Sequence, residues 1–291
     1  MQLVEYVLAA SAEEALATLT ALRGDGRVIA GGTDLMLQLQ TGDRASRGLV
    51  DVTRIPGLDE IVLYKDVLQI GAAATFARIA ASPLVQRHAP VLAEAAGWVG
   101  SPQIRNVGTL AGNVVNAMPA ADGSIALLAL DAEAEIANLT GRQWIPVKRL
   151  FVSPGVSRVD ATSEMLTAFR FPIQRPGEGS AYQRFARRKA VALPLINVAV
   201  TVCLDSESHA IADARIAVGP VAPVPFRSTH AETALRGQQF NSELVEAAAD
   251  LAASEARPRD SLLRAGKQYR QELIRVLVRR ALTAAYARAR G

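Results

Sequence analysis

Two glycine-containing segments carry the residue types that could bind a phosphorylated ligand. The first reads Ala30-Gly31-Gly32-Thr33-Asp34, and the second, about eighty residues later, reads Gly108-Thr109-Leu110-Ala111-Gly112-Asn113. Glycine allows close backbone approach, and several N–H groups can then converge on one anion. Each segment also offers a threonine hydroxyl. A single turn of this kind is weak evidence for a binding site. Two such turns, the second preceded by residues 101–106, predict a large diphosphate-bearing cofactor that is bound from two sides.

Better-known phosphate motifs are missing from this sequence. It has no Gly-x-Gly-x-x-Gly at the first segment and no Gly-Lys-Ser/Thr, so neither a Rossmann fingerprint nor a P-loop is supported. Taken alone, Gly31-Gly32 also fits a plain tight turn, and Asp34 fits a residue that caps backbone N–H groups. Asn113 and Asp122 either satisfy their own backbone or bind the hydroxyls and ring edge of a cofactor. Nothing else resembles an acid/base pair or a catalytic triad.

The composition predicts a sizeable core and no metal chemistry on this chain. Of 291 residues, 50% are hydrophobic and 21% are charged, and this length favours about two domains. The single cysteine, Cys203, falls in a strand-like run and is interpreted as a buried hydrophobe. One cysteine excludes an internal disulfide and a cluster held by four thiolates of this chain. Three separated histidines give no metal-ligand spacing.

The charge distribution and the absence of targeting signals limit which classes of protein this chain can belong to. We expect no secretion signal, no membrane span and a cytoplasmic location, because the first residues lack the signal pattern and no apolar run reaches about 18 residues. The net charge of +4 hides an asymmetry. Residues 257–291 hold ten Lys/Arg and two Asp/Glu, which leaves 22 basic and 26 acidic residues elsewhere. A basic tail can bind nucleic acid, but here the apolar Leu273, Leu277 and Leu282 share the helix, which favours a packed helix.

The elements that must position the glycine segments begin with a small α/β unit in residues 1–55. Ser11 and Glu14 have capping-box spacing and open a helix that Gly24 closes. A strand over residues 27–30 leads into the first glycine segment, residues 35–39 are apolar enough to be buried, and residues 49–52 form another strand.

A second unit extends from about residue 56 to residue 175. Its pattern predicts strands at residues 68–72, 134–137 and 165–171, and short helices at 75–79 and 90–96. Residues 171–179 contain two prolines and two glycines and are the best candidate linker. Beyond them we expect three strands, at residues 181–186, 197–204 and 210–218. Three helices follow, at residues 228–235, 242–256 and 261–290.

Four segments carry a resemblance to a known family, namely residues 29–35, 100–113, 119–122 and 257–270. Nearly end to end, the sequence resembles the FAD-binding medium subunit of molybdenum hydroxylases, and it looks closest to the separate FAD subunit of bacterial xanthine dehydrogenases. The resemblance implies an α+β fold. A two-subdomain FAD-binding domain of the vanillyl-alcohol-oxidase/PCMH-like type would occupy residues 1–175. A C-terminal domain with a three-stranded antiparallel sheet and a helix bundle would occupy residues 176–291.

The same resemblance implies a set of cofactor-binding residues. The first glycine turn of the family holds the pyrophosphate, and the match carries this over to Ile29, Ala30, Gly31, Gly32, Thr33, Asp34 and Leu35. The remaining implied FAD contacts are Thr109, Gly112, Asn113, Val115, Asp122 and, for the flavin ring, Leu166.

Two positions depart from the family pattern or resist assignment. Ala111 stands where the family usually has a second glycine, and its methyl group is tolerable if its φ is negative. Family members often carry a Lys or Tyr near the ring, and Tyr182-Gln183-Arg184 is the nearest match, which we leave unassigned. No catalytic or metal-binding residue is implied on this chain.

The function implied by the resemblance is that of an oxidoreductase subunit. FAD held here would take electrons from [2Fe-2S] clusters on a small iron–sulfur subunit, supplied by a large molybdopterin-binding subunit, and pass them to NAD⁺ or another acceptor. The hydroxylated substrate would bind on a different chain. Two alternatives stay open: a self-sufficient flavin reductase of related fold, like UDP-N-acetylmuramate dehydrogenase, and a basic nucleic-acid-binding protein, whose affinity would depend strongly on salt.

Overall fold

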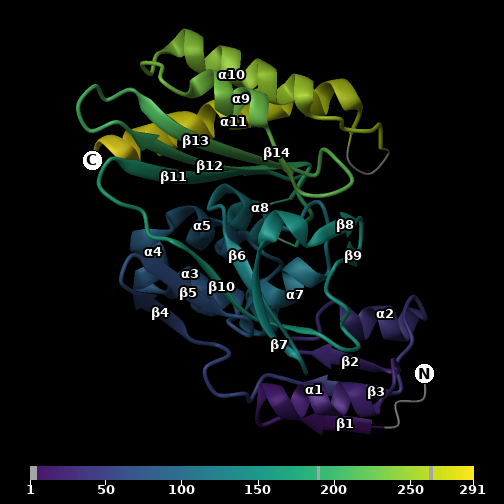
Figure 1. Cartoon of the computed structure of the whole chain (residues 1–291). Helices are drawn as coiled ribbons and strands as arrows, with labels where there is room; N and C mark the ends of the chain where they lie inside the picture. Colours follow the sequence, from purple (N-terminus) through teal and green to yellow (C-terminus); the bar gives the residue numbers. More distant parts are fainter. Residues whose placement is uncertain (1–4, 189–190, 262–264) are drawn as a thin grey trace.

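The computed structural model describes residues 5–188, 191–261 and 265–291, and has the predicted α+β class. Figure 1 shows two parts: an N-terminal part of mixed helices and strands, and a C-terminal part in which helices cover a sheet. The N-terminal part is itself divided between a first subdomain, residues 5–55, and a second subdomain, residues 56–172. The connection to the C-terminal part, residues 173–177, falls inside the predicted linker.

The first subdomain contains a three-stranded parallel sheet in the order β1-β3-β2. Its elements are β1 (Glu5–Leu8), α1 (Ala12–Ala21), β2 (Gly26–Ile29), α2 (Leu35–Thr41) and β3 (Gly48–Asp51). The predicted capping box is present, because the Ser11 hydroxyl accepts the Glu14 N–H at 3.1 Å and the Glu14 carboxylate accepts the Ala10 N–H at 2.7 Å. The expected burial of residues 35–39 is wrong. They form α2, which lies at the surface and buries only Leu39, while Leu37 is 60% exposed.

The second subdomain is built on a five-stranded antiparallel sheet in the order β4-β5-β10-β6-β7. The strands are β4 (Ile61–Tyr64), β5 (Val67–Gly71), β6 (Glu133–Asn138), β7 (Gly141–Pro146) and β10 (Met165–Pro172), with a small hairpin of β8 (Phe151–Ser153) and β9 (Val156–Ser157). The helices are α3 (Phe76–Ala81), α4 (Pro83–His88), α5 (Pro90–Trp98), α6 (Pro102–Val107), α7 (Leu110–Val115), α8 (Asp122–Ala129) and the 3-10 turn η1 (Val147–Arg149). Every residue of α8 is buried, so this helix forms the centre of the molecule.

The C-terminal part contains one more strand than predicted. Its antiparallel sheet has the order β11-β12-β13-β14, and the fourth strand is too short to leave a periodic signal. The strands are β11 (Glu178–Phe185), β12 (Ile196–Leu204), β13 (Ile211–Gly219) and β14 (Phe226–Arg227), and the helices are α9 (Thr229–Leu235), α10 (Ser242–Glu255) and α11 (Lys267–Arg290). Helix α11 begins at Lys267 and not at Ser261, and residues 262–264 of the predicted helix lie outside the described residues.

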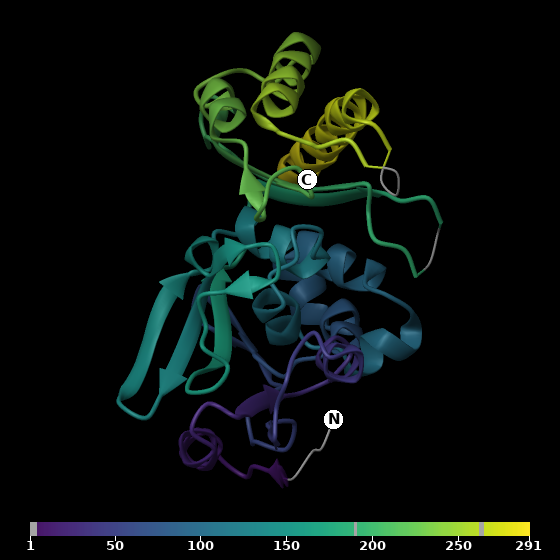
Figure 2. The same cartoon turned by 90° about the vertical axis from the view of Figure 1, so that its right-hand side faces the viewer.

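The C-terminal sheet is the middle layer of the molecule. Figures 1 and 2 show α9, α10 and α11 above it and the N-terminal part below it, where α5 and α8 contact its strands. Cys203 on β12 is half-buried and not fully buried as expected; it lies two residues from the half-buried Thr201, on the same face of the sheet. Burial raises the pKa of its thiol.

The basic C-terminal helix is packed, as predicted. Its apolar face, which includes Leu277 and Leu282, is buried against the sheet. Its arginines meet carboxylates: Arg275 lies 2.6 Å from Asp250, and the ion pairs Arg279–Glu246 and Arg288–Glu94 also measure 2.6 Å. This pairing removes much of the positive surface that a nucleic-acid-binding protein would need.

Candidate cofactor-binding site

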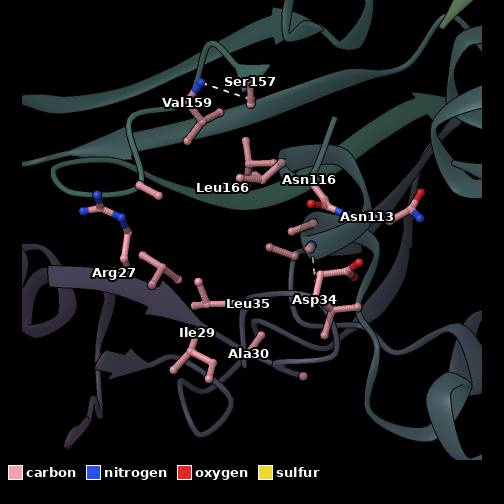
Figure 3. Close-up of a pocket in the computed structure, with 18 of the residues that line it drawn as sticks. Arg27, Ile29, Ala30, Asp34, Leu35, Asn113, Asn116, Ser157, Val159 and Leu166 are labelled. Atoms are coloured by element: carbon pink, nitrogen blue, oxygen red, sulfur yellow. Dashed lines mark hydrogen bonds between the residues drawn. The ribbon is translucent and has the colours of Figure 1, made fainter. Parts of the chain in front are cut away.

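A cavity of about 540 Å³ lies between the two subdomains of the N-terminal part. This volume suits a cofactor-sized ligand, since ligand pockets commonly measure about 300–1,000 Å³. In Figure 3, Arg27 lies at one end of the cavity and Asn113 at the other, with Leu166 between them. Twelve of the thirteen predicted site residues line it: Ile29, Ala30, Gly31, Gly32, Thr33, Asp34, Leu35, Thr109, Gly112, Asn113, Val115 and Leu166.

The first glycine segment has the free donors that a diphosphate needs. Among the hydrogen bonds of the described residues, none is donated by the backbone N–H groups of residues 31–35. Gly32 has φ +64°, a left-handed conformation that glycine adopts at little cost. Asp34 does not cap α2 with its side chain and accepts only the Thr33 hydroxyl, at 3.3 Å. The turn therefore has five consecutive N–H groups without a partner among the described residues, in a segment that lines the cavity, and such a segment can bind an anion.

Gly31 has a different role from Gly32. A Cβ atom at residue 31 would lie 1.9 Å from the carbonyl oxygen of Val107 and 3.0 Å from the Cα of Gly108. The two glycine segments are therefore in direct backbone contact, and only a residue without a side chain fits between them. This contact brings together two walls of the cavity that are far apart in the sequence.

The second glycine segment is not a turn with free donors, and that prediction is wrong. The N–H groups of Leu110 and Ala111 donate to the carbonyls of Ala74 and Ala72, at 3.1 and 3.2 Å. The Gly112 N–H donates to the Thr109 hydroxyl at 3.1 Å, because Thr109 is the N-cap of α7. This segment is therefore mainly a wall of the cavity, because, among the described residues, Thr109 is the only member of residues 108–113 whose N–H has no hydrogen-bond partner. Ala111 lies within α7 without a positive φ, so its methyl group is tolerated.

Asp122 does not line the cavity, in contrast to the other predicted residues. Its carboxylate is buried behind α7 and accepts the Tyr182 hydroxyl, the Arg184 Nε at 3.1 Å and the Asn197 Nδ2 at 3.2 Å. Burial raises the pKa of Asp122, and the Arg184 guanidinium opposes that rise. The pKa of Tyr182 is raised well above its usual value by burial and by the neighbouring carboxylate. Asp122 thus joins the N-terminal part to β11 and β12.

This buried network accounts for the segment that the sequence left unassigned. Tyr182 and Arg184 lie on β11, and the Arg184 guanidinium also lies over the Trp98 ring, 5.7 Å from its centroid. Helix α8 links the network to the cavity, because the Ser124 N–H donates to the Asn113 Oδ1 at 3.2 Å. The alternating pattern of β11 could not predict these contacts of Tyr182 and Arg184, because their partner Asp122 is about sixty residues away in the sequence.

Sequence reasoning also missed several polar residues that line the cavity. They include Gln38 and Arg44, after the first turn, and Asn116 at the end of α7. Arg27, on β2, lies at one end of the cavity in Figure 3, and Asp160 also lines the cavity. The hydrogen bond from the Thr162 side chain is the largest cause that lowers the pKa of Asp160, so its carboxylate is ionised at neutral pH. None of these residues belongs to a motif, and only the fold brings them to one place.

Fold and site together define a flavoprotein. Residues 2–174 match the family described as the FAD binding domain in molybdopterin dehydrogenase, and residues 180–285 match the CO dehydrogenase flavoprotein C-terminal domain. The chain therefore belongs to the family of FAD-binding medium subunits of molybdenum hydroxylases, and the resemblance drawn from its sequence is confirmed. The chain is a subunit of the kind found in these oxidoreductase complexes, and its N-terminal domain is an FAD-binding domain.

Individual relatives cover nearly the whole chain. It is 34% identical over 288 residues to the putative xanthine dehydrogenase FAD-binding subunit XdhB of Escherichia coli K12, covering 98% of this chain and 97% of that one. It is 30% identical to the carbon monoxide dehydrogenase medium chain of Hydrogenophaga pseudoflava, covering 98% and 97%. A solved carbon monoxide dehydrogenase from the same organism, lacking the Mo-pyranopterin moiety of its cofactor, superposes with a TM-score of 0.91 at 32% identity and covers 98% and 97%.

The helices of the described residues do not meet the requirements of a membrane-spanning segment. Within residues 5–188, 191–261 and 265–291, no helix combines the length and the apolar character that spanning a membrane requires.

Proposed function

We propose that this chain holds one FAD in the cavity between its subdomains and serves as the electron-relay subunit of a molybdenum hydroxylase complex. Bound FAD would supply storage for two electrons and their transfer to an acceptor. The partners would be an iron–sulfur small subunit with [2Fe-2S] clusters and a molybdopterin-binding large subunit, with NAD⁺ or another oxidant as acceptor. The lack of metal-ligand clusters among the described residues is compatible with partners that carry the metals.

The observation that carries this proposal is the run of five N–H groups without a partner in residues 31–35, a segment that lines a cofactor-sized cavity. These groups would hold the diphosphate. The proposed apolar contacts are Ile29, Leu35, Val115 and Leu166, and the proposed side-chain contacts on the opposite wall are Thr109 and Asn113. We leave Asp122 out of this set because its carboxylate already accepts three hydrogen bonds behind the wall.

The domain division is part of the same proposal. We assign residues 1–175 to an FAD-binding domain of the PCMH-like type and residues 176–291 to the C-terminal domain. The matched family segments, 2–174 and 180–285, and the connection at residues 173–177 support this division. A cytoplasmic location of the complex stays a prediction.

Cofactor content tests the first half of the proposal. Protein purified without added flavin should be yellow, and heating should release one equivalent of FAD, identified by its mass and spectrum. Release of FMN alone, or no flavin after reconstitution, would contradict it. The isolated chain should show at most transfer between reduced nicotinamide and a dye, and hydroxylation of a substrate by this chain alone would refute the relay role.

Assembly tests the second half. Expressed with its neighbouring genes, the chain should sediment in a complex with an iron–sulfur chain and a molybdopterin chain. A stable contact would bury about 800 Å² or more on each partner. Analytical ultracentrifugation with mass identification of the partners decides the matter, because a persistent monomer of 30.9 kDa would count heavily against the relay.

A further inference from the structure

Residues 35–47, which comprise α2 and the loop that follows it, form an arm along one side of the cavity. We call this segment the α2 arm. Its helix has one buried residue, Leu39, which packs in a small cluster with Ile29 and Leu49, apart from the main core of the molecule. A segment with so little buried apolar area opens at low cost compared with the rest of a fold.

Two hydrogen bonds connect the α2 arm to the opposite side of the cavity. Gln38 Nε2 donates to Asn116 Oδ1 at 3.2 Å, and Arg44 Nη2 donates to the Gly155 carbonyl at 3.3 Å. All four residues line the cavity, and the members of each pair are 78 and 111 residues apart in the sequence. Both bonds are long single contacts at positions that water reaches, so each holds the arm only weakly.

The receiving side of these contacts is better anchored than the arm. The Gly155 N–H donates to the Ala117 carbonyl at 3.2 Å, and the Asn116 N–H donates to Gly112 within the last turn of α7 at 2.9 Å. Two glycines of permissive backbone belong to this region: Gly32, with φ +64°, lies just before the arm, and Gly42, with φ +81°, lies within it after the helix. A Cβ at Gly42 would meet nothing within 4 Å, so no neighbouring atom packs against this side of the residue. Motion is therefore expected in the arm and not in the wall that it touches.

We propose that the α2 arm is a clasp over the cofactor, and that Gln38 and Arg44 are its two latches, which slow cofactor exchange. This inference rests on the proposed function, since the cofactor is FAD. A diphosphate held by residues 31–35 lies at the start of the arm, so an arm that swings outward about Gly32, with Gly42 adjusting inside it, frees both the donors and the exit. With the latches closed, the arm keeps the donors in place. Gln38 and Arg44 are positioning residues here, because they act on the arm.

The rate of FAD dissociation tests the clasp. In the double variant Gln38→Ala/Arg44→Ala, loaded with FAD, the dissociation rate should rise about tenfold, measured as recovery of flavin fluorescence after dilution, with a smaller rise in each single variant. Arg47→Ala is the matched control, because Arg47 is exposed in the same arm and does not line the cavity. Its rate should match the wild-type rate. An unchanged rate in the folded double variant would overturn the clasp.

A measurement on the unmodified protein covers the case in which the variants fold poorly. Hydrogen exchange of residues 35–47 should slow on addition of FAD, while exchange in α10 should not change. Equal exchange of the arm with and without FAD would also overturn the clasp. If the wild-type protein binds no FAD at all, the proposed function fails, and this outcome is distinct from FAD binding with an insensitive arm.

Discussion

Replacement of Gly31 by alanine should weaken FAD binding by about a hundredfold. The new Cβ would lie 1.9 Å from the Val107 carbonyl oxygen and 2.6 Å from its carbonyl carbon, whereas ordinary contact begins at 3.4 Å. Both neighbours are backbone atoms, so one wall of the cavity must move by about 1.5 Å to restore contact. A shift of about 1 Å in a binding constellation costs up to about 100-fold, or ~2.7 kcal/mol.

Titration of apoprotein with FAD, followed by flavin fluorescence, measures this effect, with circular dichroism and thermal unfolding as checks of folding. Gly97→Ala controls for the loss of a glycine, because its Cβ would meet nothing within 4 Å. Gly179→Ala controls for a backbone clash, since its Cβ would lie 2.0 Å from the Ala285 carbonyl oxygen, between β11 and α11. It should lower the melting temperature and leave FAD affinity nearly unchanged. Wild-type affinity in folded Gly31→Ala, or an equal loss of affinity in Gly179→Ala, would refute the reasoning.

Three further changes have defined outcomes. Gly32→Val should lower flavin occupancy strongly, because valine resists the φ of +64°. Gly32→Asn should retain more flavin, and Gly237→Val, which meets similar backbone strain at φ +75° in the C-terminal part, should match wild type. Equal occupancy in all three variants would contradict this. Arg184→Ala should lower the free energy of unfolding in urea by about 3–5 kcal/mol, since it leaves the Asp122 carboxylate buried without its cation, and a loss below about 1 kcal/mol would count against the network. Tyr182→Phe should cost about 1–3 kcal/mol at pH 7 for the lost hydroxyl donor. The pKa of Tyr182 is raised in the folded state, so the contribution of its hydroxyl to the free energy of unfolding is complete below pH ~10, where the unfolded phenol ionises, and is lost as the pH rises above that. The loss of stability above pH ~10 should therefore be shallower in Tyr182→Phe than in wild type. Equal slopes in the two proteins would exclude this titration.

Local signals in the sequence predicted the elements whose residues interact over short distances. The Ser11–Glu14 capping box formed as expected because both partners lie within one helical turn. The strands at residues 68–72 and 197–204 and the linker before Glu178 also followed from periodicity and from proline and glycine content. The turn at the first glycine segment, which lines the cavity, was also predictable from local sequence, because a pair of glycines favours a turn wherever it occurs.

The errors arose where distant partners decide the outcome. In the second glycine segment the N–H groups of Leu110 and Ala111 are paired because Ala74 and Ala72 lie beside them, and no pattern within residues 108–113 carries that information. Burial of residues 35–39 was overestimated for a similar reason. The helix that they form buries only Leu39, in a small cluster with Ile29 and Leu49 of its own subdomain, so the other four of residues 35–39 are not buried.

The pair Gly31-Gly32 carries two separate physical requirements that look identical in the sequence. Gly32 needs the left-handed backbone, which is a local property of the turn. Gly31 needs the absence of a side chain, because Val107 and Gly108 of the opposite wall touch its Cα. Gly31 thus connects the free N–H donors to the wall at the end of α6, and this backbone contact sets the distance between them. The protein itself therefore pre-organises both sides of the cavity, which lowers the ordering cost of holding a long cofactor between them.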